Sequence, residues 1–414
     1  MRAIVIGGGV VGVTTAYELH SAGLETTLLE QREGPGLETS FANAGSVCAS
    51  RAGPWASPRT IAKTLKGYLK EDSPFRLKVA ADGLQFAWLA GFARAAFGER
   101  RALRRRAMIE LGIMSQRRWH EVTEDLGLEY GPVGRGLLTV HDDAADLALA
   151  TADLPFLQSL GLDVRRLSPE ECRAAEPAAH LDDRVLGGIL ARDDESADCN
   201  RFTLALASHL RGAGVDLRFG TRVRSISARD GAGCRVQTAA EELRSDVVVV
   251  AAGGGTRPLL APLGVRIPTY PVKGYSITVR HESARQPALT IADEGRKVFV
   301  APLDGHLRAA GVADIRGDDR TLHPRRIATL RRTVARLYPG ADVDGELSAW
   351  TGLRDMTCDG PPVISPVGET GIWINSGHGS LGWTFACGAA ALVAALVTGN
   401  PQRVEARWFR LGDR

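Results

Sequence analysis

The first thirty residues place a glycine-rich turn between an apolar strand and a helix, and this feature limits the possible folds more than any other. Residues 3–6, AIVI, are typical of a buried parallel strand. Gly7, Gly9 and Gly12 follow at G-x-G-x-x-G spacing, and a helical segment comes next. The chain then returns as the strand ETTLLE, which ends in Glu30.

This pattern predicts a dinucleotide-binding site of the Rossmann type. Gly7 permits the tight turn, Gly9 lets a pyrophosphate approach the backbone, and Gly12 lets the helix and strand pack closely. The start of the helix supplies free N–H groups and the positive end of the helix dipole for the phosphates. Glu30 can accept hydrogen bonds from a ribose diol, and it disfavours a 2′-phosphate. The motif alone does not distinguish NAD from FAD.

Composition excludes several other classes. The 414 residues can form two domains or one large domain with an insert, and the net charge of +3 is too small to indicate nucleic-acid binding. The six cysteines form no CxxC pair, so neither a metal site nor a disulfide framework is expected. The first strand has no charged leader, and the most apolar run, Ala386–Thr398, is shorter than the about 20 residues of a membrane span. We therefore expect a cytoplasmic protein.

The middle of the chain alternates between helical and extended segments. Residues 76–125 favour helices, whereas SDVVVVAAGG, residues 245–254, favours a buried strand whose end can meet a nucleotide. Alternating apolar segments between residues 270 and 314 are typical of an antiparallel sheet, and a helix is predicted over Pro324–Tyr338. These segments predict a second, sheet-based part beside the nucleotide-binding part.

A second glycine-rich turn precedes an apolar helix near the end of the sequence, in NSGHGSLGWTFACGAAALVAALV, residues 375–397. A loop that caps a core helix explains the apolar run, but it does not explain the glycines at 377, 379 and 382. Four motifs in and before this region resemble those of the FAD-dependent D-amino acid dehydrogenase family, within the D-amino acid oxidase/glycine oxidase superfamily. In sequence order they are ETS-x-ANAG, YP-x-KGYS, WTGLR-x-MT-x-DG-x-PV and GHG-x-LGWT-x-ACG.

This resemblance covers essentially the whole chain and implies one long cofactor, FAD, with two anchors. It implies an α/β fold in which a Rossmann-like FAD-binding domain accompanies a discontinuous α+β substrate domain built on an antiparallel sheet. The FAD-binding domain is expected over 1–75, 150–262 and 345–414. The substrate-binding domain is expected over 76–149 and 263–344.

The resemblance also implies where FAD binds. The N-terminal element holds the ADP half, and the C-terminal turn lies near the flavin N1–C2=O edge, where a positive dipole end stabilises the charge of reduced flavin. The expected cofactor-binding residues are Gly7, Gly9, Val10, Val11, Gly12, Glu30, Gln31, Ser40, Asn43, Ala44, Gly45, Val223, Ala252, Gly253, Gly379, Ser380, Leu381, Gly382, Trp383 and Thr384.

Three further residues are expected at the substrate. Arg354, in the GLR motif, matches the arginine that binds the substrate carboxylate, because a guanidinium forms a bidentate fork with that group. Tyr275, in KGYS, resembles a substrate-pocket position, with a core tyrosine as the alternative. His378 lies in the flavin turn, where it either hydrogen-bonds substrate or flavin or has a structural role.

The implied reaction is oxidation of a D-amino acid to an imino acid, which water hydrolyses to a 2-oxo acid and ammonia. Hydride passes from the substrate Cα to flavin N5, which requires orientation and an unprotonated amine, so we expect no dedicated catalytic base. The alternative substrates are a cyclic imino acid such as cis-4-hydroxy-D-proline or D-proline, and glycine or sarcosine. A different class of protein is also open, namely a non-catalytic nucleotide-binding redox subunit of a larger complex.

The resemblance favours a dehydrogenase, whose electrons pass to a quinone or respiratory-chain acceptor instead of oxygen. Five arginines lie between Arg100 and Arg106. They form either a solvated helix face or a contact with an anionic surface, such as the inner membrane or a partner subunit. The second reading places the protein on the cytoplasmic face of the inner membrane.

Overall fold

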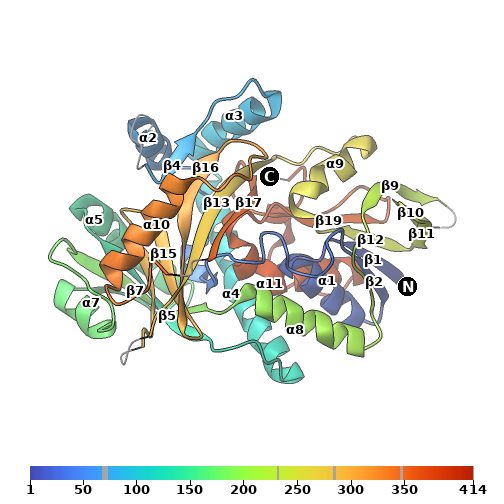
Figure 1. Ribbon diagram of the computed structural model, residues 1–414. Helices are drawn as coiled ribbons and strands as arrows, with labels where there is room; N and C mark the ends of the chain where they lie inside the picture. Colours follow the sequence, from blue (N-terminus) through green and yellow to red (C-terminus); the bar gives the residue numbers. More distant parts are fainter. Residues whose placement is uncertain (68–72, 231–232, 283–285, 346–347, 414) are drawn as a thin grey trace.

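The computed structural model describes residues 1–67, 73–230, 233–282, 286–345 and 348–413. Within these ranges two large β-sheets lie side by side, and helices pack around both (Figure 1). A small three-stranded sheet lies at the end of the molecule nearest the N-terminus. Its strands are β9 (Val223–Asp230), β10 (Gly233–Thr238) and β11 (Glu242–Ser245).

The six-stranded sheet contains the elements that the first glycine-rich turn predicts. Its strands pair in parallel except for β18 and β19 at one edge. Helix α1 (Val10–Ser21) connects β1 to β2, so the predicted strand–turn–helix–strand unit is confirmed. In sheet order the strands are β18 (Val363–Pro366), β19 (Ile372–Ser376), β12 (Val247–Val250), β1 (Arg2–Ile6), β2 (Glu25–Leu29) and β8 (Asp216–Arg218).

The ten-stranded sheet is mostly antiparallel, as the alternating segments predict. One of its faces packs against α10 (Pro324–Leu337) through an apolar cluster that includes Ile277, Val300 and Leu330. In sheet order the main strands are β17 (Ser348–Thr357), β13 (Thr269–Arg280), β16 (His306–Ile315), β15 (Val298–Leu303), β14 (Thr290–Asp293), β5 (Gly134–His141), β7 (Gly187–Ser196) and β3 (Ser46–Val47). Two more strands join this sheet, β4 (Phe75–Leu77) beside β16 and β6 (Val164–Leu167) beside β7.

The segment of residues 76–125 is largely helical, as predicted, and forms α3 and α4. Helices α2 and α3 lie at the top of the view in Figure 1, whereas α4 runs toward the bottom and packs against α11. The remaining helices, apart from α1 and α10, are α2 (Pro58–Gly67), α3 (Gly83–Phe97), α4 (Arg101–Leu126), α5 (Ala144–Ala152), α6 (Leu154–Ser159), α7 (Pro169–Ala175), α8 (Cys199–Gly212), α9 (Thr256–Leu260) and α11 (Gly382–Thr398).

Both parts of the expected fold class are therefore present. The sheets do not follow the predicted domain boundaries everywhere, however. Strands β7 and β17 lie in segments that we assigned to the FAD-binding domain, yet both pair within the ten-stranded sheet. The chain thus passes between the two sheets more often than the sequence suggests, and the boundaries themselves stay a prediction.

The last helix, α11, joins the two halves of the molecule. Thr14 Oγ1 of α1 donates a hydrogen bond to the carbonyl of Ala386 at 3.1 Å. On the opposite side, Gly388 N–H donates to Ser115 Oγ of α4 at 3.0 Å, and a Cβ at Gly388 would lie 2.7 Å from the Ser115 Cβ. This glycine therefore permits a contact between α11 and α4 that a larger residue excludes.

One correction concerns the length of this apolar segment. With the 3₁₀ turn before it, α11 spans Gly379–Thr398, which by length and composition alone is enough to cross a membrane. The expectation from Ala386–Thr398 that the segment is too short is therefore wrong. However, 67% of its apolar window is buried inside the protein, which is the environment of a core helix.

Candidate functional site

The N-terminal glycine turn is built as the sequence predicts. Gly7 has φ +115°, and a Cβ there would lie 2.5 Å from the carbonyl oxygen of Ala251, at the end of β12. A Cβ at Gly12 would lie 1.8 Å from the Gly7 oxygen, so only glycine allows this close approach. The N–H of Val10, in the first turn of α1, donates to Ser40 Oγ at 2.9 Å. A residue of the ETS-x-ANAG segment thus holds the glycine turn in place.

Glu30 stabilises the glycine turn, in addition to its predicted contact with the ribose. Its Oε2 accepts the N–H of Gly8 at 2.5 Å, and its Oε1 accepts the N–H of Arg32 at 2.7 Å. A carboxylate has about four acceptor positions, so both oxygens retain capacity for ribose hydroxyls. The acid therefore fixes the turn while it faces the cavity described next.

A single cavity of about 1420 Å³ extends from the N-terminal turn to the ten-stranded sheet. This volume exceeds the range of about 300–1,000 Å³ typical of sites for small ligands. Every predicted cofactor-binding residue lines it except Gly12, Gly45 and Thr384. Gly12 lies behind Gly7, whereas the other two hold the cavity wall: the Gly45 carbonyl accepts from Trp383 Nε1, and Thr384 Oγ1 accepts from Cys48 N–H. The cavity also reaches Arg354, Tyr275 and His378.

His378 lies in the C-terminal glycine turn and is connected to α1. Thr15 Oγ1 donates to the carbonyl of Val11 and accepts from Asn375 Nδ2 at 3.0 Å. Because Nδ2 is the donor there, Asn375 Oδ1 is the acceptor that receives the His378 Nε2 proton at 3.0 Å. The other ring nitrogen, Nδ1, is therefore an acceptor, and it has no hydrogen-bond partner among the described residues. Burial lowers the pKa of His378 to about 4, so the ring is neutral at pH 7.

Arg354 projects from β17 across the adjacent strand β13. A Cβ at Gly274 would overlap its guanidinium, so this glycine leaves the space that the side chain occupies. Its Nη1 donates a long hydrogen bond of 3.4 Å to the carbonyl of Val312, and its guanidinium carbon lies 6.0 Å from the Trp55 ring centre. Burial lowers the pKa of Arg354 to about 10. No carboxylate of the described residues forms an ion pair with it, so a partly buried cation faces the cavity without a counter-charge.

A bulge in the sheet presents the Val312 carbonyl to Arg354. The pairing of β13 with β16 shifts register between Gly274 and Tyr275, and Val312 is the extra residue. Its φ is +45°, a conformation that is rare and unfavourable for a β-branched side chain. Unusual backbone conformations of this kind are concentrated at functional sites, which supports the assignment of this region as the substrate side of the cavity.

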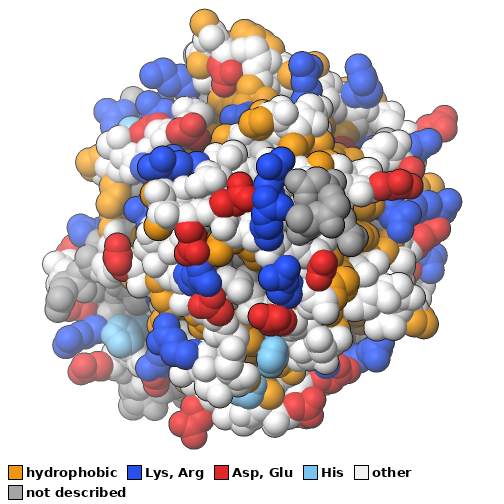
Figure 2. Space-filling view, turned by 90° about the vertical axis from the view of Figure 1, so that its right-hand side faces the viewer, with side chains coloured by type: hydrophobic (Ala, Val, Ile, Leu, Met, Phe, Trp, Pro, Cys, Tyr) orange, Lys and Arg blue, Asp and Glu red, His pale blue; other side chains and the backbone are white. Residues whose placement is uncertain are grey.

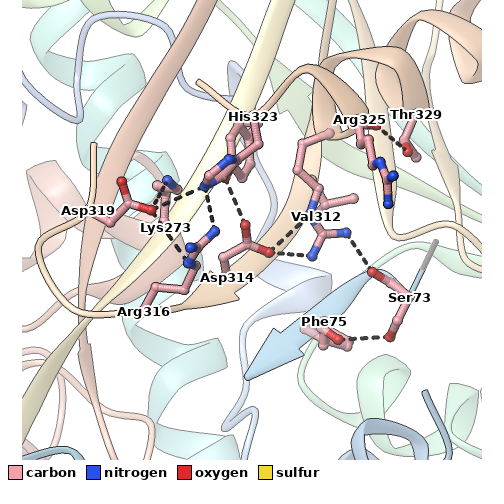
Figure 3. A network of polar contacts seen from close by, with 12 residues as sticks. Ser73, Phe75, Lys273, Val312, Asp314, Arg316, Asp319, His323, Arg325 and Thr329 are labelled. Atoms are coloured by element: carbon pink, nitrogen blue, oxygen red, sulfur yellow. Dashed lines mark hydrogen bonds and ion pairs between the residues drawn. The ribbon is translucent and has the colours of Figure 1, made fainter. Parts of the chain in front are cut away.

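Tyr275 lies beside the cavity, but its side chain has the core arrangement that the sequence left as the alternative. Its hydroxyl donates to Asp314 Oδ2 at 2.8 Å, and Asp314 Oδ1 also pairs with Arg326. Burial, together with this carboxylate, raises the pKa of the tyrosine. Figure 3 shows Asp314 within a polar network that also contains Lys273, Asp319 and His323. The hydroxyl is therefore already hydrogen-bonded within the core between the ten-stranded sheet and α10.

One titratable residue of the cavity, Asp355, was not predicted from the sequence. Ser376 Oγ donates to its Oδ2 at 3.2 Å, and burial raises the pKa of this carboxyl to about 6. Thr256 Oγ1 and Ser376 Oγ lie 2.9 Å apart, which extends the network to α9. The only signal in the sequence was its position next to Arg354, within a motif whose other residues drew attention first.

Comparison with known proteins agrees with this geometry. The model of the DAO family, described as FAD dependent oxidoreductase, matches residues 2–396. A D-amino acid dehydrogenase of Rhizobium johnstonii is 37% identical over 409 residues, which cover 98% of each chain. A D-amino acid dehydrogenase of Dechloromonas aromatica is also 37% identical, over 99% of this chain and 100% of its own.

Solved structures with a similar fold are more distant in sequence. Glycine oxidase from Geobacillus kaustophilus superposes with a TM-score of 0.78 at 22% identity, over 100% of this chain and 99% of the other. L-Proline dehydrogenase from P. horikoshii gives a TM-score of 0.74 at 19% identity, over 99% and 96% of the two chains. At these identities the likeness concerns the fold alone.

The neutral state of His378 predicts a specific response of stability to acid. Because its pKa is lower in the folded than in the unfolded protein, the unfolded chain binds the proton first and stability is lost as pH falls from about 6.5 to about 4. We expect His378→Gln to lose less unfolding free energy than the wild type across this interval. Thermal or urea unfolding at several pH values measures the difference, with the exposed His306→Gln as the control. An identical acid response of His378→Gln and wild type would contradict the buried neutral ring.

Proposed function

Because the chain belongs to the DAO family of FAD dependent oxidoreductases, we propose that it oxidises a D-amino acid with FAD and delivers the electrons to an acceptor other than oxygen. The D-amino acid comes from the names of relatives that are 37% identical over nearly the full chain. The structural observation that carries the proposal is Arg354, a partly buried guanidinium without a described counter-charge in the same cavity as both glycine turns. A non-catalytic redox subunit has no use for such a cation.

The residues of the cavity fit FAD. Gly7 and Gly12 lack the Cβ atoms that would fill the turn, and this turn opens onto the free N–H groups at the start of α1. Gly379, which also lines the cavity, has φ +58° and begins the 3₁₀ turn that precedes α11, so a second helix start faces the same space. One elongated dinucleotide accounts for two such anchors in one cavity, whereas a shorter ligand accounts for one.

The protein side of the mechanism is mainly orientation. FAD, when bound, supplies the two-electron acceptor for the oxidation. Arg354 binds the substrate carboxylate as a charge-assisted, bidentate pair, and Val312 and Gly274 fix the direction of its guanidinium. The neutral His378 leaves Nδ1 free to accept a hydrogen bond from a bound N–H group. The imino acid product then reacts with water to give a 2-oxo acid and ammonia.

A surface on α3 and the start of α4 supports a contact with a membrane or a partner protein that holds the electron acceptor. Phe86, Ala90, Ala93 and Phe97 follow one another at helical spacing on an exposed face, and the exposed fractions of Phe86 and Phe97 are 53% and 71%. Leu103 on α4 is 50% exposed. Such an apolar stripe is typical of surfaces that contact a bilayer or a partner.

The arginines next to this stripe divide into two groups. Arg101, Arg104 and Arg105 have partners inside the protein, respectively the Ala56 carbonyl, Asp359 and Asp153. Arg100 and Arg106 are exposed, as is Arg94 on α3, although Arg100 donates to the Asp413 carbonyl and Arg106 pairs with Glu110. On the face of the molecule that Figure 2 shows, cationic and acidic side chains are interspersed without a large single-sign area. We therefore propose that the exposed phenylalanines and arginines of α3 and α4 contact an anionic membrane surface, where the reduced enzyme meets a quinone acceptor.

The first test concerns Arg354. Arg354→Ala removes the fork that binds the carboxylate, so we expect kcat/KM for a D-amino acid to fall by about 30-fold or more, which corresponds to about 2–5 kcal/mol. The variant should retain its flavin absorbance, because the residue holds substrate and not cofactor. Arg354→Lys keeps the charge without the fork and should recover part of the loss. An unchanged kcat/KM in Arg354→Ala would place the carboxylate site elsewhere.

The second test concerns the acceptor. After anaerobic reduction by substrate, the flavin should be reoxidised slowly by oxygen and quickly by a quinone analogue or dye. Stopped-flow absorbance of the flavin measures both rates on the same preparation. Rapid formation of hydrogen peroxide, one molecule for each substrate consumed, would make the protein an oxidase.

The third test concerns the exposed stripe. The wild-type protein should co-sediment with vesicles that contain anionic lipid, and added salt should weaken this binding because it screens the arginines. The double variant Phe86→Ser/Phe97→Ser should bind less, because each aromatic ring that enters the membrane contributes apolar contact area. Leu186→Ser/Leu204→Ser, which changes exposed leucines elsewhere, serves as the control. Equal binding of the two variants would remove the stripe from the membrane contact.

A further inference from the structure

The cavity contains a second group of cations beyond Arg354. Arg51, Arg59, Lys63 and Lys297 all line it, together with the carboxylates of Glu294 and Asp146. None of these residues belongs to either glycine turn. We call these four cations and two carboxylates the distal cluster.

The distal cluster approaches Arg354 through one member, Lys297, whose backbone lies one strand away in the sheet. The Arg354 guanidinium reaches the Val312 carbonyl on β16, and the N–H of the same Val312 donates to the carbonyl of Lys297 at 3.3 Å, just before β15. Because neighbouring strands lie about 4.8 Å apart, the cluster begins about one strand beyond the guanidinium. Ala310, on β16, also lines the cavity near this point and has a small side chain. Arg354 and the four cations of the distal cluster all line this one cavity, so it extends past both cationic sites.

The distal cluster has more positive than negative charge. Glu294 Oε2 pairs with Arg51 Nη2 at 2.9 Å, and its other oxygen pairs with Lys297. Asp146 likewise pairs with Lys63 at 2.6 Å and with Arg59. Four cations thus share two carboxylates. Burial lowers the pKa of Lys297, and the nearby charges of Arg51 and Arg59 add to this effect although Glu294 opposes it.

Asp194 is a further carboxylate near Arg51, but it does not fully balance the excess positive charge of the distal cluster. It is completely buried and accepts hydrogen bonds from the N–H and the hydroxyl of Ser50. Burial raises the pKa of Asp194 to about 7, so this group is only partly ionised at neutral pH. A positive charge therefore remains on the cavity side of the cluster.

A buried histidine supplies independent evidence for a ligand at the same place. His141, at the end of β5, lines the cavity and is only 3% exposed. Neither of its ring nitrogens has a hydrogen-bond partner in the part of the chain that the structure describes. Arg51 lies with its guanidinium 5.8 Å from the centre of the Phe299 ring, which restricts its orientation. Free polar groups and an oriented arginine in one cavity are features of a binding site.

We propose that the distal cluster binds the side-chain carboxylate of the substrate, so that the preferred substrates are acidic D-amino acids of the D-aspartate and D-glutamate type. This inference rests on the proposed function, because Arg354 binds the α-carboxylate in both. A substrate with two carboxylates places one at each cationic site of the same cavity. A neutral side chain of the same shape leaves the distal charge without a counter-ion.

Turnover gives the first test. D-Glutamate and D-glutamine have nearly the same shape but differ in side-chain charge, and we expect kcat/KM to favour D-glutamate by about 10-fold or more. Arg51→Gln should lower this ratio toward one. Lys63→Gln, whose side chain is 43% exposed on α2, should lower it in the same direction with little risk to folding. Arg135→Gln, an arginine that is 83% exposed and does not line the cavity, should leave the ratio unchanged.

Binding without turnover gives the second test. Glutarate and butyrate differ by one carboxylate. The change in flavin absorbance when each acid is added measures its binding. Glutarate should bind about 10-fold more tightly or better to the wild type, and Arg51→Gln and Lys63→Gln should reduce this advantage. Tighter, Arg51-dependent binding of glutarate in a protein that oxidises no D-amino acid would support the site and reject the proposed function. Oxidation of D-amino acids with no preference for D-glutamate, and equal binding of glutarate and butyrate, would overturn the distal site alone.

Discussion

The packing of α1 against α11 is the interaction on which the rest of the site depends. Thr14 and Thr15 are consecutive residues of α1, and they hydrogen-bond respectively to the Ala386 carbonyl and to Asn375. The two contacts fix the starts of both helices relative to each other, so that both glycine turns open onto one cavity. Since Asn375 also orients His378, a shift between the helices changes the cofactor space and the histidine together.

The substrate side depends on a different device, which is a sheet that departs from regular pairing at one point. The bulge at Val312 stores backbone strain of order 1–3 kcal/mol, and the surrounding strands of the ten-stranded sheet compensate for it. As a result, Val312 contacts Arg354 through its carbonyl and Lys297 of the distal cluster through its N–H. A regular ladder at this position points the Val312 carbonyl at a neighbouring strand, and the guanidinium then loses a partner.

The sequence predicted local features well because their causes are local. Glycine spacing, apolar runs and the acid at Glu30 each depend on a few neighbouring residues, and the units built from them are confirmed. The face on which Tyr275 lies was undecidable, because a bulge changes the alternation of side chains and leaves no mark of its own in the sequence. Asp355 and the distal cluster were missed for a related reason. Arg51, Asp146 and Glu294 are far apart in the chain, and only the completed sheet brings them together.

The order of strands in the six-stranded sheet has a consequence for synthesis of the protein. Ala3 of β1 pairs with Val247 of β12, and Val248 pairs with Ile372 of β19. At about 5–20 residues per second, a ribosome needs roughly 12–50 s to pass from β1 to β12, and longer to reach β19. Until β12 is made, the edge of β1 that pairs with it has no partner, and an unpaired strand edge favours aggregation and chaperone binding. Since the second glycine turn follows β19, the cavity is complete for its cofactor only when translation has almost finished.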